Sequence, residues 1–209
     1  MFITLEGIDG SGKTTLIKKI EFYLKTKGYK FLITREPGGS EISESIREVI
    51  LKDFPNDEME PWTEALLYIA ARKQHFEKII KPNLKKGIII ISDRFSDSTL
   101  VYQGFARGLS VESLIKIQSI VFNDVKPNIT FFLDCSPETL TKRIKTKSEK
   151  EVNRFDLESL EFHKKVYEGY LNLLEKDKKR FRVISSEKTA DEVFLQCKEI
   201  MDKEIKINK

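Results

Sequence analysis

The nine residues from Gly7 to Thr15, GIDGSGKTT, constrain the fold of this chain more than any other segment. They follow a short apolar run, residues 2–6, and precede residues 13–27, whose apolar side chains have helical spacing. They match G-x-x-x-x-G-K-[S/T] in the strand–loop–helix setting that this phosphate-binding loop requires. Its glycines let backbone N–H groups approach phosphate oxygens, and the following helix points the positive end of its dipole at them. The sequence therefore predicts binding of a nucleoside triphosphate.

Strands and helices alternate along the rest of the chain. The helix at 62–81 is expected to end at Pro82. The run 88–92 is almost entirely isoleucine, which is typical of a strand buried on both faces. The pattern predicts an α/β fold of three layers, a five-stranded parallel sheet flanked by helices. Further strands are expected at 31–34, 129–133 and 182–184, and further helices at 40–51, 111–122, 137–145, 157–176 and 189–203.

Length and composition limit the function. The 209 residues fit one domain, 1–209, and the charged connection at 143–156 is predicted to be a lid. A net charge of +4, with no basic stripe interleaved with aromatic residues, does not predict nucleic-acid binding. The longest apolar run, 88–91, is too short to cross a membrane, so a cytoplasmic protein is expected. Cys135 and Cys197 have no metal-site or redox spacing, and two reduced thiols are expected.

The loop also predicts a magnesium site. Lys13 is expected to reach the β- and γ-phosphates, and the Thr14 hydroxyl to bind Mg²⁺. A second ligand has to come from the end of a neighbouring strand, and Asp93 is favoured. Asp134 competes, although it fits at least as well as a helix cap. The sequence lacks a guanine-reading N-K-x-D motif, which argues against a GTPase. The short chain without a basic stripe argues against a motor or nucleic-acid ATPase, and a small kinase remains.

Three segments are candidates for an acceptor site. The first is REPGG at 35–39, and the second is LLYIAARKQ, in which Tyr68 and Arg72 share one helix face. A core tyrosine and a solvated arginine are the alternative interpretation of that pair. The third segment, DRFSDSTLVYQG, contains Arg94. A buried positive charge at this position is unusual, and an anionic partner would explain it. The candidate residues outside the second segment are Pro37, Arg47, Arg94, Ser98, Thr99, Tyr102 and Gln103.

The segments FITLEGIDGSGKTT, TREPGG, LLYIAAR, DRFSDSTLVYQG and RFD…YEGYL follow one another along the whole chain. Together they resemble the thymidylate kinases of the bacterial type, a family of P-loop nucleoside monophosphate kinases. The resemblance implies transfer of the ATP γ-phosphate to dTMP, yielding dTDP, with Mg²⁺, in a homodimer. It also suggests that helices 62–81 and 111–122 form the interface between the two subunits.

The resemblance further implies roles for single residues. Tyr68 matches an aromatic residue, usually Phe, that stacks on thymine, and Arg72 matches the arginine that contacts a thymine carbonyl. Arg94 matches the arginine that grips the dTMP phosphate. The other implied roles are phosphate binding by Arg47, base reading by Thr99 and Gln103, selection of deoxyribose by Tyr102, contact with the acceptor by Asp9 and packing on adenine by Arg143. The implied ATP-binding set is Gly7, Asp9, Gly10, Ser11, Gly12, Lys13, Thr14, Thr15 and Arg143.

No general base is needed, because the acceptor phosphate is already ionised and catalysis rests on positioning and charge neutralisation. The loop has no arginine at positions 9–11, so the lid is expected to supply a cation. The candidates are Arg143, Lys145, Lys147 and Arg154, and Arg154 and Lys147 are favoured because Arg143 resembles the residue that packs on adenine. A solvated charged segment is the alternative for Lys145, Lys147 and Lys150. Other kinases remain open as alternatives, namely a deoxynucleoside kinase with Asp9, Glu36 or Asp93 as base, or another nucleoside monophosphate kinase. The expected catalytic set is Asp9, Lys13, Arg94 and Arg154.

Overall fold

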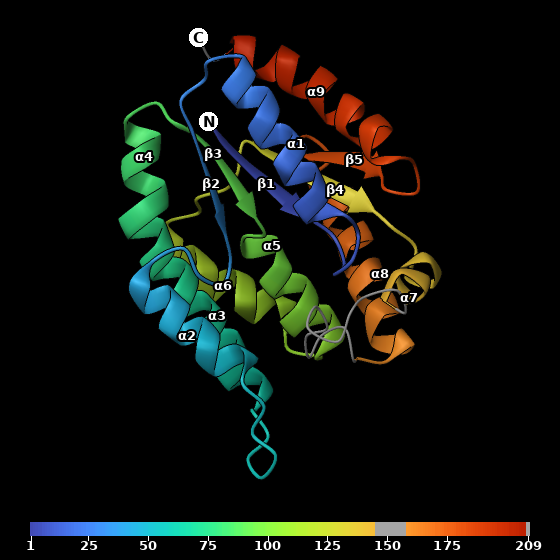
Figure 1. Cartoon of the computed structure of the whole chain (residues 1–209). Coiled ribbons are helices and arrows are strands. Elements are labelled where there is room, and N and C mark those ends of the chain that lie inside the picture. The colour runs from blue at the N-terminus through green and yellow to red at the C-terminus, as the bar shows by residue number, and fades with distance from the viewer. Residues whose placement is uncertain (145–157, 208–209) are drawn as a thin grey trace.

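The computed structural model of the chain describes residues 1–144 and 158–207. Its strands form one parallel sheet in the order β2-β3-β1-β4-β5 (Figure 1). The predicted five-stranded parallel sheet is confirmed, and each strand lies within one residue of its predicted bounds. The strands are β1 (Phe2–Glu6), β2 (Phe31–Arg35), β3 (Ile89–Asp93), β4 (Ile129–Asp134) and β5 (Phe181–Ser185).

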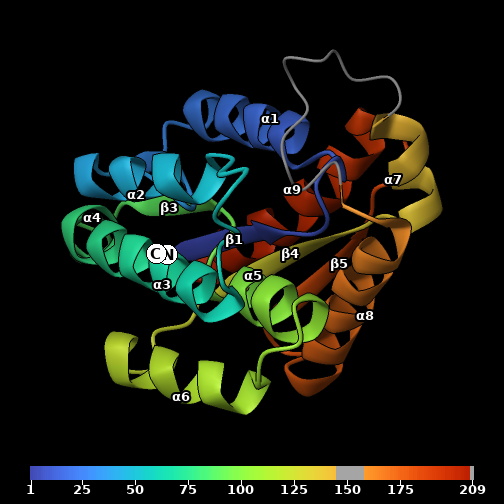
Figure 2. The same cartoon turned by 90° about the horizontal axis from the view of Figure 1, so that it is seen from below.

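Alternating side chains of the strands build one core on each face of the sheet. Ile3 and Leu5 of β1 pack against α1 (Lys13–Thr26) and α9 (Ala190–Ile207). Phe2 points to the other face, where the core includes side chains of α3 (Pro61–His75), α6 (Val111–Phe122) and α8 (Leu160–Lys176). Figure 2 shows α1 and α6 on opposite sides of the sheet. The three-layer arrangement is therefore confirmed.

The prediction that a helix ends at Pro82 is wrong. After α3 the chain continues as a π-helical segment, η1 (Phe76–Ile80), and then as α4 (Lys81–Lys85). Pro82 is the second residue of α4 and follows the π-helical turn directly, so the N–H that proline lacks falls at the junction between the two segments. The side-chain amide of Asn83 donates to the Ile79 carbonyl over 2.7 Å and supports this junction.

The segment after β3 is helical, which the sequence did not predict. It forms α5 (Ser96–Thr99) and then the π-helical segment η2 (Leu100–Ala106). Its polar residues, SDST, precede a mixed run, LVYQGFA, that has no amphipathic period. Burial explains the difference, because η2 packs along α8 and both sides of the segment are covered.

The remaining helices are α2 (Glu41–Leu51), which packs along α3, and α7 (Pro137–Ile144). α9 ends four residues later than predicted, at Ile207, and the predicted start of α8 at residue 157 lies outside the described residues. Within the described part of the chain, no helix has the length and apolar character needed to cross a membrane.

Candidate active site

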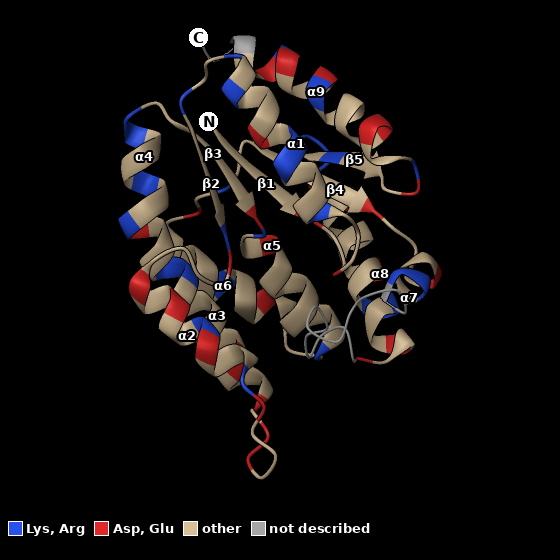
Figure 3. Cartoon of the chain, in the orientation of Figure 1, with Lys and Arg blue, Asp and Glu red and all other residues tan. Residues whose placement is uncertain are grey.

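The charged residues of the first four strands lie at the carboxyl ends of these strands. Glu6, Arg35, Asp93 and Asp134 are the last residues of β1 to β4, and the residues before them in each strand are uncharged. Figure 3 colours acidic residues red and basic residues blue. Because the strands are parallel, these four side chains lie along one edge of the sheet. Ligands of open α/β sheets bind at this edge.

The phosphate-binding loop begins directly after β1, at this edge. Gly7 has φ 140°, and a Cβ there would lie 2.8 Å from the Leu133 carbonyl oxygen, so the position accepts only glycine. Lys13 is buried, and its Nζ donates to the carbonyl oxygens of Gly7 and Ile8 over 3.1 and 3.0 Å. Burial lowers the pKa of Lys13, and the positive charge of Arg94 adds to this effect. The side chain of Lys13 therefore lies against the phosphate-binding loop, whose phosphates it is predicted to contact.

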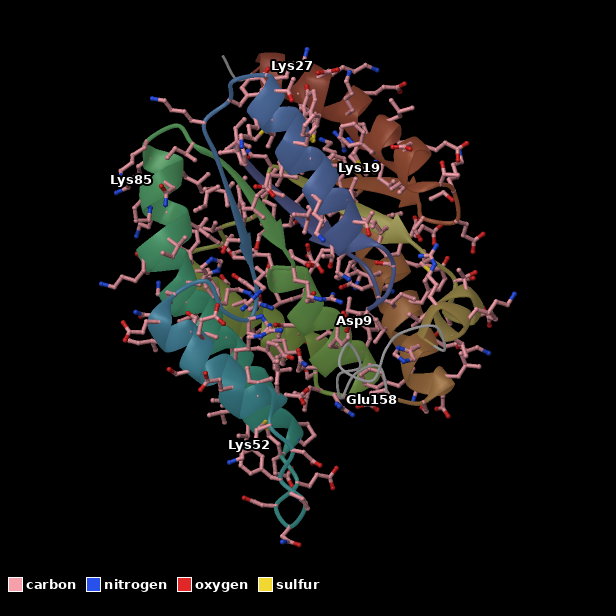
Figure 4. All side chains as sticks on the ribbon, viewed as in Figure 1. Asp9, Lys19, Lys27, Lys52, Lys85 and Glu158 are labelled. Atoms are coloured by element: carbon pink, nitrogen blue, oxygen red, sulfur yellow. The ribbon has the colours of Figure 1, made fainter. Side chains whose placement is uncertain are left out.

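A cavity of about 570 Å³ opens beside the loop and brings the two predicted sets of residues together. Figure 4 shows Asp9, one of its lining residues, near the start of α1. Arg35 and Glu36 of the predicted segment REPGG also line it, and Leu51 is a lining residue that the sequence did not predict. The predicted residues that line it are Asp9, Gly10, Gly12, Lys13, Thr14, Thr15, Pro37, Arg47, Tyr68, Asp93, Arg94, Ser98, Thr99, Tyr102 and Gln103.

Arg94 donates hydrogen bonds to four side chains around the cavity. Its Nη1 donates to Ser98 Oγ and Tyr170 OH, both over 3.0 Å. Its Nη2 donates to Asp9 Oδ1 over 2.8 Å and to Tyr102 OH over 2.9 Å. Burial disfavours the charged guanidinium, but the electrostatic attraction of these neighbours raises the pKa of Arg94 well above its ordinary value. The guanidinium is therefore a permanent positive charge.

Arg72 lies behind the cavity wall and does not line it. Its side chain is 2% exposed, so the alternative of a solvated arginine is wrong. Its Nε lies 2.5 Å from Glu36 Oε2, and its Nη1 donates to Thr99 Oγ1 over 2.8 Å. Tyr68, one turn earlier on α3, does line the cavity. Contact of Arg72 with a bound base stays a prediction.

Asp93 offers an oxygen suited to a metal ion. Its Oδ1 is buried and has no hydrogen-bond partner within residues 1–144 and 158–207. Asp134 differs, because its Oδ1 accepts a hydrogen bond from Tyr167 OH over 2.9 Å. Burial, and after it this hydrogen bond, raise the pKa of Tyr167 to about 12. Of the two aspartates that compete in the sequence, Asp93 is the one whose buried oxygen remains to be satisfied.

A second hollow, of about 310 Å³, lies on the other side of the phosphate-binding loop. It is lined by residues of the loop, by Arg143 of α7 and by Ser186 after β5. Arg143 Nη1 donates to the Gly10 carbonyl over 3.2 Å, and its Nη2 donates to the Ser186 carbonyl over 2.6 Å. The predicted lid residues Lys145, Lys147, Lys150 and Arg154 lie outside the described residues.

Comparison with known proteins identifies the family. The family model for thymidylate kinase matches residues 5–196. The chain belongs to the thymidylate kinase family. It is 49% identical to the thymidylate kinase of Mycoplasma capricolum over 208 residues, covering 100% of this chain and 97% of that one. It is 50% identical to the thymidylate kinase of Clostridium novyi over 198 residues, covering 94% of this chain and 96% of that one. The crystal structure of thymidylate kinase from Ehrlichia chaffeensis aligns with a TM-score of 0.76 at 33% identity, covering 96% of this chain and 98% of that one.

The resemblance of the motifs to thymidylate kinases is thereby confirmed, but two residues next to the thymidylate kinase cavity were missed. Glu6 is fully buried at the end of β1 and accepts hydrogen bonds from three groups around Arg94. A carboxylate directly before Gly7, inside an apolar strand, was a signal that could have found it. Tyr170 belongs to the YEGYL segment of α8, but nothing within that segment assigned its side chain to the cavity.

Proposed function

We propose that this protein transfers the γ-phosphate of ATP to dTMP, forming dTDP and ADP, with Mg²⁺ bound. The observation that carries the proposal is a single cavity lined both by Lys13 and Thr14 of the phosphate-binding loop and by Arg94, Tyr68 and Tyr102. A kinase has to hold two phosphate groups in contact, and one continuous cavity permits this. The relatives' names support dTMP as the acceptor.

The reaction depends on positive charges around the two phosphates. An ionised phosphate is itself the nucleophile, so Arg94 and Lys13 act by neutralising negative charge and by positioning the reacting groups. Lys13 leaves the loop carbonyls to reach the β- and γ-phosphates of ATP. Arg94 holds the phosphate of dTMP, and Arg47, whose Nη1 lies 2.9 Å from the Pro37 carbonyl, assists from the opposite wall.

The donor set of the site fits magnesium. Asp93, whose buried Oδ1 is unsatisfied, and Thr14 line the same cavity, and Mg²⁺ favours few protein oxygens together with phosphate oxygens and water. Asp93 and Thr14 would hold the ion. When bound, it supplies a positive charge that stabilises the phosphoryl group during transfer.

The acceptor end recognises a base and a deoxyribose. Tyr68 presents an aromatic ring for stacking on thymine, and Thr99 and Gln103 lie where they read the edge of the base. Tyr102 lies beneath the sugar, and its hydroxyl accepts a hydrogen bond from Arg94 Nη2. One arginine thus connects recognition of the sugar with recognition of the phosphate.

Residues beyond the cavity complete the proposal. Arg143 packs on the adenine of ATP in the second hollow, which borders the phosphate-binding loop. Arg154, in the lid at 143–156 of a single domain, 1–209, contacts the γ-phosphate.

The protein acts as a cytoplasmic homodimer, and exposed apolar side chains on α2, α3 and α6 support an interface there. These side chains are Ile42, Val49, Trp62, Leu66, Ile115 and Ile120.

The test is a coupled ADP-release assay with ATP and Mg²⁺ across different acceptors. We expect turnover of dTMP to exceed that of AMP, CMP and GMP, and thymidine to give no product. Equal or better activity on another nucleoside monophosphate would overturn the choice of acceptor. Phosphorylation of thymidine would favour a deoxynucleoside kinase instead.

A further inference from the structure

A buried carboxylate lies directly beneath Arg94. Glu6, at the end of β1, is 0% exposed. Its Oε1 accepts the backbone N–H of Phe95 over 2.8 Å. Its Oε2 accepts the hydroxyls of Ser98, over 2.6 Å, and of Tyr170, over 2.8 Å. Three groups from two different elements thus converge on this one side chain.

The same two hydroxyls also bind Arg94. An ionised carboxylate can only accept hydrogen bonds and a guanidinium can only donate them. Ser98 and Tyr170 therefore donate their hydrogens to Glu6 and turn their lone pairs toward Arg94 Nη1, which lies 3.0 Å from each hydroxyl oxygen. The charge of Glu6 sets the direction of both hydrogen bonds to the arginine.

The guanidinium of Arg94 has one anchored edge and one exchangeable edge. The partners of Nη1, Ser98 and Tyr170, are 8% and 0% exposed. Nη2 bonds to Asp9 and Tyr102 at the cavity, and the side chain of Asp9 is 26% exposed. An incoming phosphate can replace Asp9 on Nη2, whereas Nη1 keeps its buried partners.

The backbone at Arg94 requires support as well. Its φ is 73°, a left-handed conformation that costs free energy for a residue with a Cβ and persists only where neighbouring groups fix it. Arg94 N donates to the Leu5 carbonyl over 3.0 Å, and Ser92 Oγ donates to the Arg94 carbonyl over 2.8 Å. The bond from Phe95 N to Glu6 fixes the following peptide.

We propose that Glu6, acting through the hydroxyls of Tyr170 and Ser98, is a positioning residue that fixes Arg94 in the orientation that receives the acceptor phosphate. This inference rests on the proposed function, because it gives Arg94 the acceptor phosphate as its ligand. Tyr170 matters most for the test, since it comes from α8 and removal of its hydroxyl leaves the ring in the core.

The experiment compares binding of dTMP with binding of thymidine, which lacks the phosphate. For Tyr170→Phe we expect the dissociation constant of dTMP to rise about tenfold, the size expected for loss of a hydrogen bond to a charged group. We expect thymidine, measured as a competitive inhibitor, to bind with an unchanged constant. Glu6→Gln should show the same selective loss, because an amide does not hold both hydroxyls as donors.

Tyr167→Phe is the matched control, since it removes a phenol hydroxyl from the same helix. That hydroxyl donates to Asp134 and does not bind Arg94. A control that loses dTMP selectively, or a Tyr170→Phe variant that weakens dTMP and thymidine equally, would overturn the inference. If Glu6→Gln fails to fold, Tyr170→Phe alone decides. A wild-type protein that binds dTMP no better than thymidine would contradict the proposed function, whereas wild-type selectivity retained in Tyr170→Phe would contradict only the positioning role.

Discussion

Burial of Glu6 has a consequence for stability that can be measured. Burial first, and then the negative charge of Asp97, raise the pKa of Glu6 from the ordinary 4.5 to about 7, against the opposing effect of Arg94. At about 1.4 kcal/mol per pH unit this difference corresponds to about 3 kcal/mol. The titratable or charged groups that face Glu6 are Asp97, Arg94, Tyr170, Tyr102 and Lys13.

The direction follows from proton binding. A carboxyl whose pKa is higher in the folded state binds its proton more tightly there, so folding is favoured as the pH falls. The stabilisation is fully present below pH 4.5 and is lost as the pH rises through about 7. Glu6→Gln cannot titrate. We therefore expect the free energy of unfolding of the wild type, minus that of the variant, to increase by about 2 to 3 kcal/mol from pH 8 to pH 5.

Urea unfolding of both proteins at half-unit pH steps measures this difference. The other titrating groups occur in both proteins, so the contributions of those that do not interact with Glu6 cancel in the subtraction. A difference between wild type and variant that stays constant from pH 5 to pH 8 would refute the reasoning. It would mean that Glu6 titrates at the same pH in the folded and unfolded chains.

Three further predictions concern the metal, the core and the surface. Asp93→Asn removes the charge of the proposed magnesium ligand, so we expect turnover to fall about a hundredfold and the Mg²⁺ concentration at half-maximal rate to rise. Arg180→Leu leaves the buried carboxylate of Asp97 without its two hydrogen bonds of 2.5 and 3.0 Å, so we expect a loss of about 3 kcal/mol in urea unfolding. Ile120→Glu puts a charge on the most exposed large apolar side chain of the described residues. If this side chain lies in the interface of the proposed homodimer, light scattering should show dimers for the wild type and monomers for the variant.

The parts of the fold that the sequence predicts are those determined locally. Strand β3 is predicted because three of its five residues are consecutive isoleucines, and the phosphate-binding loop because its glycines and lysine have a fixed spacing. The helix formed by α5 and η2 could not be predicted, since its stability comes from packing against α8 and not from its own apolar period. The continuation of the helix through Pro82 likewise depends on the π-helical turn before it.

The candidate site divides in the same way. Residues that belong to a motif, such as Lys13 and Arg94, were found because the motif carries the chemistry. Glu6 and Tyr170 are 164 positions apart, and only the packing of α8 on the sheet brings the phenol to the carboxylate. The sequence singled out Arg72 as a site residue but did not predict that it lies behind the cavity wall. Sequence periodicity does not show which side of a helix faces a cavity.

The charges around the cavity are balanced before any nucleotide arrives. Arg94 lies 2.8 Å from Asp9 and 3.8 Å from Glu6, and Lys13 lies 3.9 Å from Asp9. An acceptor phosphate therefore has to displace Asp9, the exposed partner, while Glu6 keeps the arginine in place. With the proposed function, this displacement leaves Asp9 available for the contact with the acceptor that the resemblance implies. The ionised form of Glu6 lowers stability above pH 7 but directs Tyr170 and Ser98 toward the arginine, so the group that costs the fold stability also orients the phosphate-binding residue.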